Sequence, residues 1–247
     1  MPTLHFLANP ARFRRFSARV LPALSVVTAL AVAVGLYWAL VIAPPDYQQG
    51  ETVRIMFIHV PAATIAMGGY VLLATLGASL LVWRHPLAAL MARATAPVGA
   101  TFTAVGLITG SLWGRPMWGT WWVWDARLTS YLILLFLYLG YIALVEAIDD
   151  TRRADQAGAL LAVVGAVNVP IIYYSVRWWN TLHQGATISA SGGVKMADTM
   201  LMAMLLMTLA CWAYAFAVVF MRARAIVVER EQHTAWVSAL AQSAKGA

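Results

Sequence analysis

Six long runs of apolar residues constrain this chain more than any other feature of its sequence. They lie near residues 20–43, 55–83, 94–112, 128–148, 156–176 and 199–221. Each holds about the 20 residues that a helix needs to cross a hydrocarbon core of roughly 30 Å. The composition agrees, because 62% of the residues are hydrophobic and only 11% are charged, against roughly 25% charged in a soluble domain. We therefore expect an all-α polytopic membrane protein, a bundle of six transmembrane helices in one domain spanning residues 1–247.

The first apolar run follows a basic N-terminal tail, residues 1–19, as a secretory signal does. The run from Val20 to Ala43 is longer than the 7–15 apolar residues of a signal peptide. We therefore expect a retained membrane helix that ends before Pro44 and Pro45. A second tail, residues 222–247, follows the sixth run.

Positive charge is distributed unevenly between the connections. With six spans, both tails lie on one side of the membrane, and that side carries twelve of the seventeen basic residues. They are Arg12, Arg14, Arg15, Arg19, Arg84, Arg93, Arg152, Arg153, Arg222, Arg224, Arg230 and Lys245. Lys and Arg collect on the cytoplasmic side of membrane proteins, so the pattern predicts cytoplasmic termini. The net charge of +7 thus reflects topology, and we expect no nucleic-acid partner.

Tryptophans gather in the connection predicted between the third and fourth spans, on the outer side. Five of the chain's eleven lie within residues 113–124. An interfacial belt or a protein-docking surface is one explanation, although a belt normally spreads its aromatics over all the helix ends. Trp118, Trp121 and Trp122 have the i, i+3, i+4 spacing that a helical turn would present on one face, with Trp124 close behind. The cluster favours a platform for a flat aromatic ligand, since each ring contact adds about 0.5–1.5 kcal/mol.

Two histidines are predicted at the same outer depth as this cluster. His59 begins the second span and His183 lies in the connection before the sixth. Neutral imidazole is a common axial ligand of haem iron. Each histidine alone is more often structural, but the pair beside a tryptophan cluster predicts a haem site with His59 and His183 as iron ligands.

Four outer arginines could bind the propionates of such a ligand through paired hydrogen bonds. Among Arg54, Arg115, Arg127 and Arg177 we favour Arg127, because it follows the tryptophans directly. A salt bridge with Asp125 or a lipid phosphate contact explains Arg127 equally well. Asp125 could also orient a tryptophan N–H.

Several absences limit the chemistry. The sequence contains no Cys-x-x-Cys-His motif for covalent haem attachment and no Gly-x-x-x-x-Gly-Lys-Ser/Thr motif for ATP hydrolysis. The single cysteine, Cys211, lies within the sixth apolar run and is expected to be a packing residue. No charged residue lies near the middle of an apolar run, which argues against ion-coupled transport.

The segment from Trp118 to Thr129 resembles the tryptophan-rich "WWD" signature of the haem-handling membrane proteins of cytochrome c maturation. The segments 55–63 and 178–185, which contain the two histidines, resemble one branch of them, the haem exporter/delivery protein C (CcmC) family. The resemblance spans roughly residues 20–221, and the length and number of spans also match.

The resemblance implies a function and a location. It implies that His59 and His183 ligate non-covalent haem b as transient cargo, and that the signature around Trp118, Trp121 and Trp122 forms the platform and a docking surface. It implies a site on the periplasmic face of the bacterial inner membrane. A periplasmic haem chaperone would receive the haem for c-type cytochrome biogenesis. A small single-span membrane subunit and the ATPase and membrane subunits of an ABC transporter would be partners. The expected role is binding and transfer rather than enzymatic catalysis.

Two other functions compete. One is a haem- or quinone-linked electron-transfer subunit, although such proteins usually hold haem by histidines within the helical bundle. The other is the membrane subunit of a haem exporter. The absence of Asp, Glu, Lys and Arg near the middle of the apolar runs argues against it.

Overall fold

The computed structural model describes residues 9–183, 188–189, 193–194 and 196–239. Lys195, Gln184, Gly185, Lys245 and the outer parts of both predicted tails lie outside these residues. The elements in chain order are α1 (Pro10–Tyr37), the π-helical turn η2 (Trp38–Ile42), the 3₁₀ turn η3 (Glu51–Ile55), α2 (Met56–Trp83), α3 (Pro86–Trp118), α4 (Ala126–Ala147), α5 (Thr151–Gly165), α6 (Asn168–Trp178), β1 (Ile188–Ser189), β2 (Gly193–Val194) and α7 (Asp198–Arg230).

The prediction of six membrane-spanning helices is confirmed. Six helical stretches of the described residues are long and apolar enough to cross a membrane. The first combines α1 with η2, and the fifth combines α5 with α6. Several boundaries differ from the sequence prediction: α1 begins at Pro10 rather than near residue 20, α3 extends from Pro86 to Trp118 rather than over 94–112, and α7 continues past residue 221 to Arg230. In addition, β1 and β2 pair antiparallel as a two-residue ladder before α7.

The fifth span is interrupted because of Pro170. Proline has no N–H to donate to the carbonyl four residues earlier, and its ring crowds that carbonyl. The helix accordingly breaks at Ala166 and Val167, where Val169 N–H instead donates to the Ala166 carbonyl at 3.1 Å. The Asn168 side chain donates to the Ser130 carbonyl of α4 at 2.9 Å. This buried bond holds the start of α6 against α4.

Buried tyrosines fill the space between α2, α3 and α4. The rings of Tyr70 and Tyr138 meet edge to face with centroids 5.0 Å apart, and the Tyr138 hydroxyl donates to the Ala66 carbonyl at 2.8 Å. Gly99 and Gly106 of α3 face the rings of Tyr138 and Tyr131, where a Cβ would collide. Helix α3 can therefore approach α4 closely at both levels.

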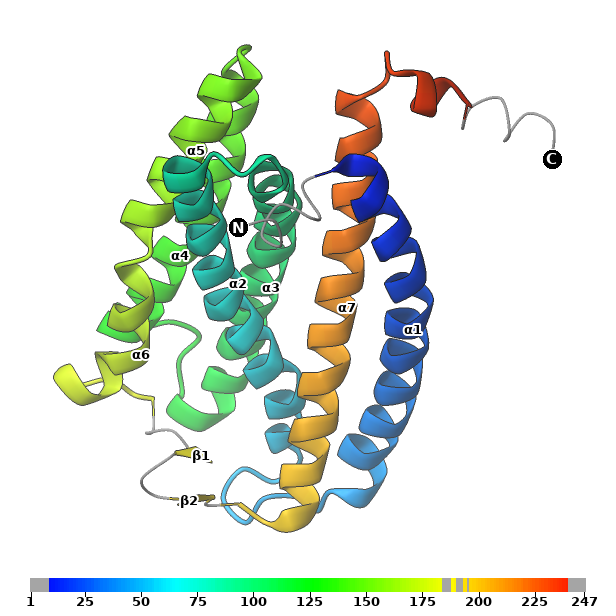
Figure 1. Cartoon of the computed structure of the whole chain (residues 1–247). Coiled ribbons are helices and arrows are strands. Elements are labelled where there is room, and N and C mark those ends of the chain that lie inside the picture. The colour runs from blue at the N-terminus through cyan, green and yellow to red at the C-terminus, as the bar shows by residue number, and fades with distance from the viewer. Residues whose placement is uncertain (1–8, 184–187, 190–192, 195, 240–247) are drawn as a thin grey trace.

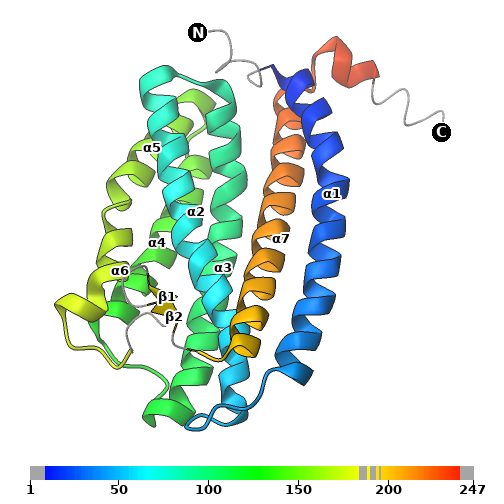
Figure 2. The ribbon, with the colours of Figure 1, turned by 60° about the horizontal axis from the view of Figure 1, so that its bottom comes forward.

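Helices α1 and α7 lie side by side, next to the bundle of α2–α6 (Figure 1, Figure 2). An ion-pair cluster joins α7 to that bundle. Asp155 of α5 binds Arg93 of α3 (Nε–Oδ1 2.5 Å) and Arg230 of α7 (NH1–Oδ2 3.0 Å). The carboxylate is almost fully buried, so the two guanidiniums, rather than water, compensate its charge.

The start of α1 and the end of α7 lie at one end of the molecule (Figure 1). An even number of spans requires this arrangement. The start of α2, the end of α3, the start of α4 and the end of α6 meet at the opposite end. The predicted haem residues belong to these helix ends.

Two glycines provide a test of helix packing. A Cβ on Gly77 of α2 would lie 2.9 Å from the Ala159 carbonyl oxygen and 3.2 Å from its Cα. Backbone cannot move aside as a side chain can, so Gly77→Ala should lower the free energy of unfolding by about 1–3 kcal/mol. The Gly140→Ala variant is the control, because the nearest atom to its Cβ is a Leu161 methyl at 3.8 Å. It should leave the stability equal or raise it by up to about 1 kcal/mol. Thermal unfolding in detergent measures both, and equal midpoints would contradict the close approach of α2 and α5.

Candidate functional site

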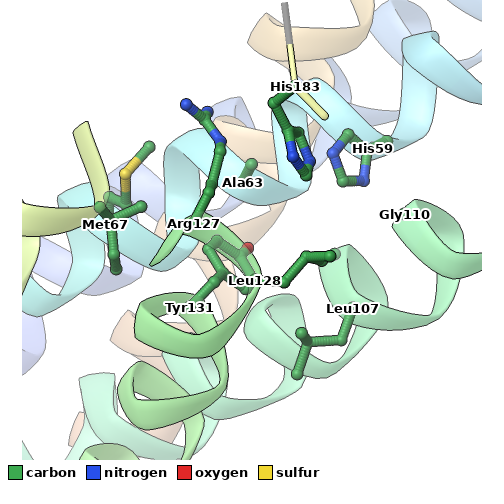
Figure 3. A pocket seen from close by; sticks show the side chains of 11 residues that line it. His59, Ala63, Met67, Leu107, Gly110, Arg127, Leu128, Tyr131 and His183 are labelled. Carbon is green, nitrogen blue, oxygen red and sulfur yellow. The ribbon is translucent and has the colours of Figure 1, made fainter. Parts of the chain in front are cut away.

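His59 and His183 converge on one cavity, although 124 positions separate them in the sequence. His59 is on the first turn of α2, and His183 lies in the non-helical segment after α6. Figure 3 shows both imidazole rings at this cavity, with Arg127 and Tyr131 of α4 beside them. The sequence prediction that the two histidines lie at a common depth therefore agrees with the arrangement.

The cavity is small and mostly apolar. Its volume is about 30 Å³, which is room for about two water molecules. Besides the histidines and Arg127, its polar lining includes the Tyr131 hydroxyl. That hydroxyl is buried and has no hydrogen-bond partner among the described residues. Apolar side chains of α2, α3, α4 and α6 close the remaining walls.

The His59 ring rests against α3. Its Nδ1 lies 3.1 Å from the Thr109 hydroxyl oxygen, and the Trp113 ring meets it edge to face at 5.8 Å. Trp113 is fixed in turn by a hydrogen bond from its Nε1 to the Gln49 side chain at 2.9 Å. One face of α3 and the segment before α2 thus orient the imidazole.

His183 is packed between the end of α3 and the start of α4. The Trp118 ring meets it edge to face with centroids 4.7 Å apart, and an Asp125 oxygen lies 3.8 Å from its Nδ1. Burial and, to a lesser extent, the nearby Arg127 guanidinium lower the pKa of His183 to about 4, although Asp125 partly opposes this shift. The imidazole is therefore neutral at pH 7, the form that binds a metal.

Asp125 connects α4 to the His183 segment. Its Oδ1 accepts the Leu128 N–H at 2.7 Å and caps the N-terminus of α4. Its Oδ2 accepts the Leu182 N–H at 3.4 Å. The sequence allows either a tryptophan N–H or Arg127 as a partner of Asp125. Neither contact is formed among the described residues.

The tryptophan cluster is divided between a helix and a loop. A helical turn over Trp118, Trp121 and Trp122 is not formed, because α3 ends at Trp118 and Gly119 has a φ of 76°. Beyond it, the Thr120 hydroxyl donates to the Trp122 carbonyl at 3.0 Å and holds an irregular segment.

Exposure separates the tryptophans further. Trp121 and Trp124 are 55% and 76% exposed, whereas Trp118 and Trp122 are partly buried. The Trp122 and Trp124 rings meet edge to face at 5.4 Å. Trp118 is therefore a wall for His183, whereas Trp121 and Trp124 present a surface.

Only one of the four candidate arginines lines the cavity. Arg127 does so and has no ion pair or hydrogen bond among the described residues. Arg54 binds Glu51 at 2.5 Å and the Ala39 carbonyl. Arg115 donates to the Gly119 carbonyl, and Arg177 lies over the Tyr174 ring. The preference for Arg127 as the anion-binding residue is consistent with this placement.

The sequence prediction assigned no role at the site to three further residues. Thr109 and Trp113 contact His59, and Tyr131 lines the cavity. The spacing of these residues along the sequence contained part of the information needed to predict them. Thr109 and Trp113 are four residues apart, so they share a helix face if the third span continues that far. Tyr131 follows Arg127 by the same interval. The prediction ended the third span at residue 112, which concealed the first relation.

Substitutions of Asp125 should distinguish the contribution of its helix cap to stability from that of its charge. Asp125→Ala removes the cap of α4 and should lower the stability by about 1 kcal/mol. Asp125→Asn keeps a capping oxygen and should remain close to the original stability, since Asn and Asp cap helices equally well. Thermal unfolding in detergent compares the two. Equal destabilisation by both variants would show that the charge, not the cap, stabilises this junction.

Comparisons with known proteins identify the family of this chain. The profile of the family described as "CcmC: Heme exporter protein C" matches residues 3–238. The chain is 56% identical over 210 residues to a heme exporter protein C of Bradyrhizobium diazoefficiens, covering 84% of this chain and 79% of the relative. It is 53% identical over 185 residues to that of Escherichia coli K12, covering 75% and 76%. The protein of that name from Haemophilus influenzae is 42% identical over 98% of both chains. This chain therefore belongs to the heme exporter protein C (CcmC) family.

Proposed function

We propose that this protein binds haem b non-covalently between His59 and His183 and delivers it to a periplasmic haem chaperone for c-type cytochrome biogenesis. The relatives are named heme exporters, which supports haem as the cargo. One observation carries the proposal: imidazoles from two distant segments line a single cavity. The pKa of His183, lowered to about 4, leaves its nitrogen lone pair available at neutral pH.

The residues at the cavity fit the chemistry of haem. Haem iron accepts two axial nitrogen ligands, which the histidines supply. The propionates are anionic, and the Arg127 guanidinium faces the same cavity without an ion-pair partner among the described residues. The orphaned Tyr131 hydroxyl could donate a hydrogen bond to the cargo.

The space between the histidines requires a movement. A cavity of about 30 Å³ is too small for a macrocycle. His59 is on a helix, whereas His183 lies in a non-helical segment attached through Asp125 and Leu182. We infer that the His183 segment moves away from α2 and α3 to admit haem.

We further propose that the site faces the periplasm from the bacterial inner membrane. The site lies at the end of the bundle opposite the start of α1 and the end of α7 (Figure 1). Of the twelve basic residues predicted on the cytoplasmic side, the eleven that the structure describes lie in the helix ends and the α2–α3 connection toward that other end. The positive-inside rule therefore supports cytoplasmic termini.

Transfer would use the exposed aromatic surface beside the cavity. Trp121 and Trp124 are exposed, as are Trp178 and Trp179 at the end of α6. Large exposed aromatics are typical anchors of protein interfaces. We propose that the chaperone docks here, and that the role is transfer rather than enzymatic catalysis. A small single-span subunit and an ABC transporter would be further partners.

Replacement of either histidine should weaken haem binding. His59→Ala or His183→Ala should reduce the affinity by at least about 10-fold, since loss of a group that merely supports a metal ligand already costs about 10–100-fold. The visible spectrum of the purified protein should also change, because one axial ligand is lost. His233→Ala is the control, since His233 is exposed on the C-terminal side of α7. Unchanged spectra and affinities in both site variants would refute the ligand assignment.

Replacement of the exposed tryptophans should separate transfer from binding. Trp121→Ala combined with Trp124→Ala should reduce haem transfer to the chaperone by about 10-fold or more, as hot-spot residues contribute about 2 kcal/mol each. Bound haem and its spectrum should change little. Trp83→Ala is the matched control, because Trp83 is 67% exposed at the opposite end of α2. Full transfer by the double variant would contradict the docking surface.

A further inference from the structure

We propose that Thr109 is the positioning residue of the haem site. It fixes the tautomer and the orientation of His59, so that His59 presents Nε2 as a ready iron ligand. This inference rests on the proposed haem-binding function and assigns a role to a residue outside the ligand pair. Three contacts of the Thr109 hydroxyl carry it.

The Thr109 hydroxyl has only one hydrogen to donate. Its oxygen lies 2.7 Å from the Val105 carbonyl, 3.3 Å from the Gly106 carbonyl and 3.1 Å from His59 Nδ1. Carbonyl oxygens can only accept, and the short contact to Val105 therefore takes the hydrogen. Toward His59 the hydroxyl is then an acceptor. The Nδ1 atom must carry the proton, and the Nε2 atom keeps its lone pair.

The neighbours of Thr109 on α3 hold the ring in this position. A Cβ on Gly110 would lie 3.0 Å from His59 Cε1, so the absence of a side chain lets the imidazole lie against the helix. Trp113, one turn later, meets the ring edge to face at 5.8 Å. Thr109 thus supplies the side-chain polar contact to the ring, and the Gly106 backbone on the same helix is its other polar neighbour.

His183 has no equivalent support. Its Nδ1 is buried without a hydrogen-bond partner among the described residues, and the nearest Asp125 oxygen lies 3.8 Å away. That distance is too long for a hydrogen bond. The two proposed ligands are therefore held differently. The His59 ring is already positioned by its contact with Thr109 of α3, whereas His183 must move before its Nδ1 can form a hydrogen bond.

A hydrogen bond from Nδ1–H strengthens the ligand. It makes the imidazole a better electron donor through Nε2, and supporting contacts of this kind typically change metal affinity by about 10–100-fold. A stronger donor stabilises ferric over ferrous iron. Loss of the Thr109 hydroxyl should therefore weaken haem binding and raise the reduction potential of bound haem.

The test compares variants that keep or remove this hydroxyl. Thr109→Val preserves the branched shape and removes the acceptor, so it should bind haem about 10-fold more weakly and with a higher midpoint potential. Thr109→Ser retains the hydroxyl and should restore both values. Thr103→Val is the matched control, because buried Thr103 on the same helix donates to the Gly99 carbonyl at 2.7 Å but has no histidine partner among the described residues. Haem titration of the full-length protein in detergent and redox titration supply the measurements.

The outcomes separate this inference from the proposed function. A parent protein that binds no haem overturns the function itself. If the parent binds haem and Thr109→Val matches it in affinity and potential, the function stands and the role of Thr109 is wrong. Equal effects of Thr109→Val and Thr103→Val would indicate general packing and would also overturn it. If Thr109→Val does not fold, Thr109→Ala takes its place with the same expectations.

Discussion

Lipid offers no hydrogen-bond partner to the peptide backbone, so each segment within the membrane must satisfy its own N–H and C=O groups. Six helical stretches meet this constraint here, and within the spans that the structure describes irregular backbone is confined to their ends and to one break before Pro170. Part of the candidate site lies at such irregular places, beside helical residues such as His59 and Arg127. Helix α3 ends at Trp118, α4 begins after Asp125, and the segment after α6 carries His183. Polar chemistry gathers where the helices can no longer use their own backbone bonds.

The helical bundle also determines how rigidly each part of the site is held. Small residues and buried tyrosines let α3 pack closely on α2 and α4, which fixes His59 relative to Thr109. His183 depends instead on the Trp118 ring and on Asp125, whose other oxygen caps α4. A site with one fixed and one loosely held ligand suits cargo that must be released. This difference in support links the packing of the membrane domain to the proposed transfer.

Much of the architecture and part of the site could be predicted from the sequence. Hydropathy is sufficient to identify all six spans, because a span needs about 20 consecutive, mostly apolar residues and so leaves a long signal in the sequence. Spacing failed where the local backbone departs from a helix: Trp118, Trp121 and Trp122 do not share a helical turn, because the chain turns at Gly119. Helix α3 extends six residues beyond the predicted boundary at residue 112, and the contact of Trp113 with His59 lies in that extension.

By itself the sequence determined that this chain crosses a membrane six times and that two histidines accompany a tryptophan cluster at one end. Those properties follow from the composition of single segments, or from the order in which the spans alternate across the membrane. Tertiary structure alone decided which groups meet. It placed Arg127, alone of the four outer arginines, at the cavity. It also brought Asp125 to the Leu182 N–H and Thr109 to His59. These pairings depend on the rotation and register of helices packed against one another, to within about an ångström, and no pattern along a single helix encodes them.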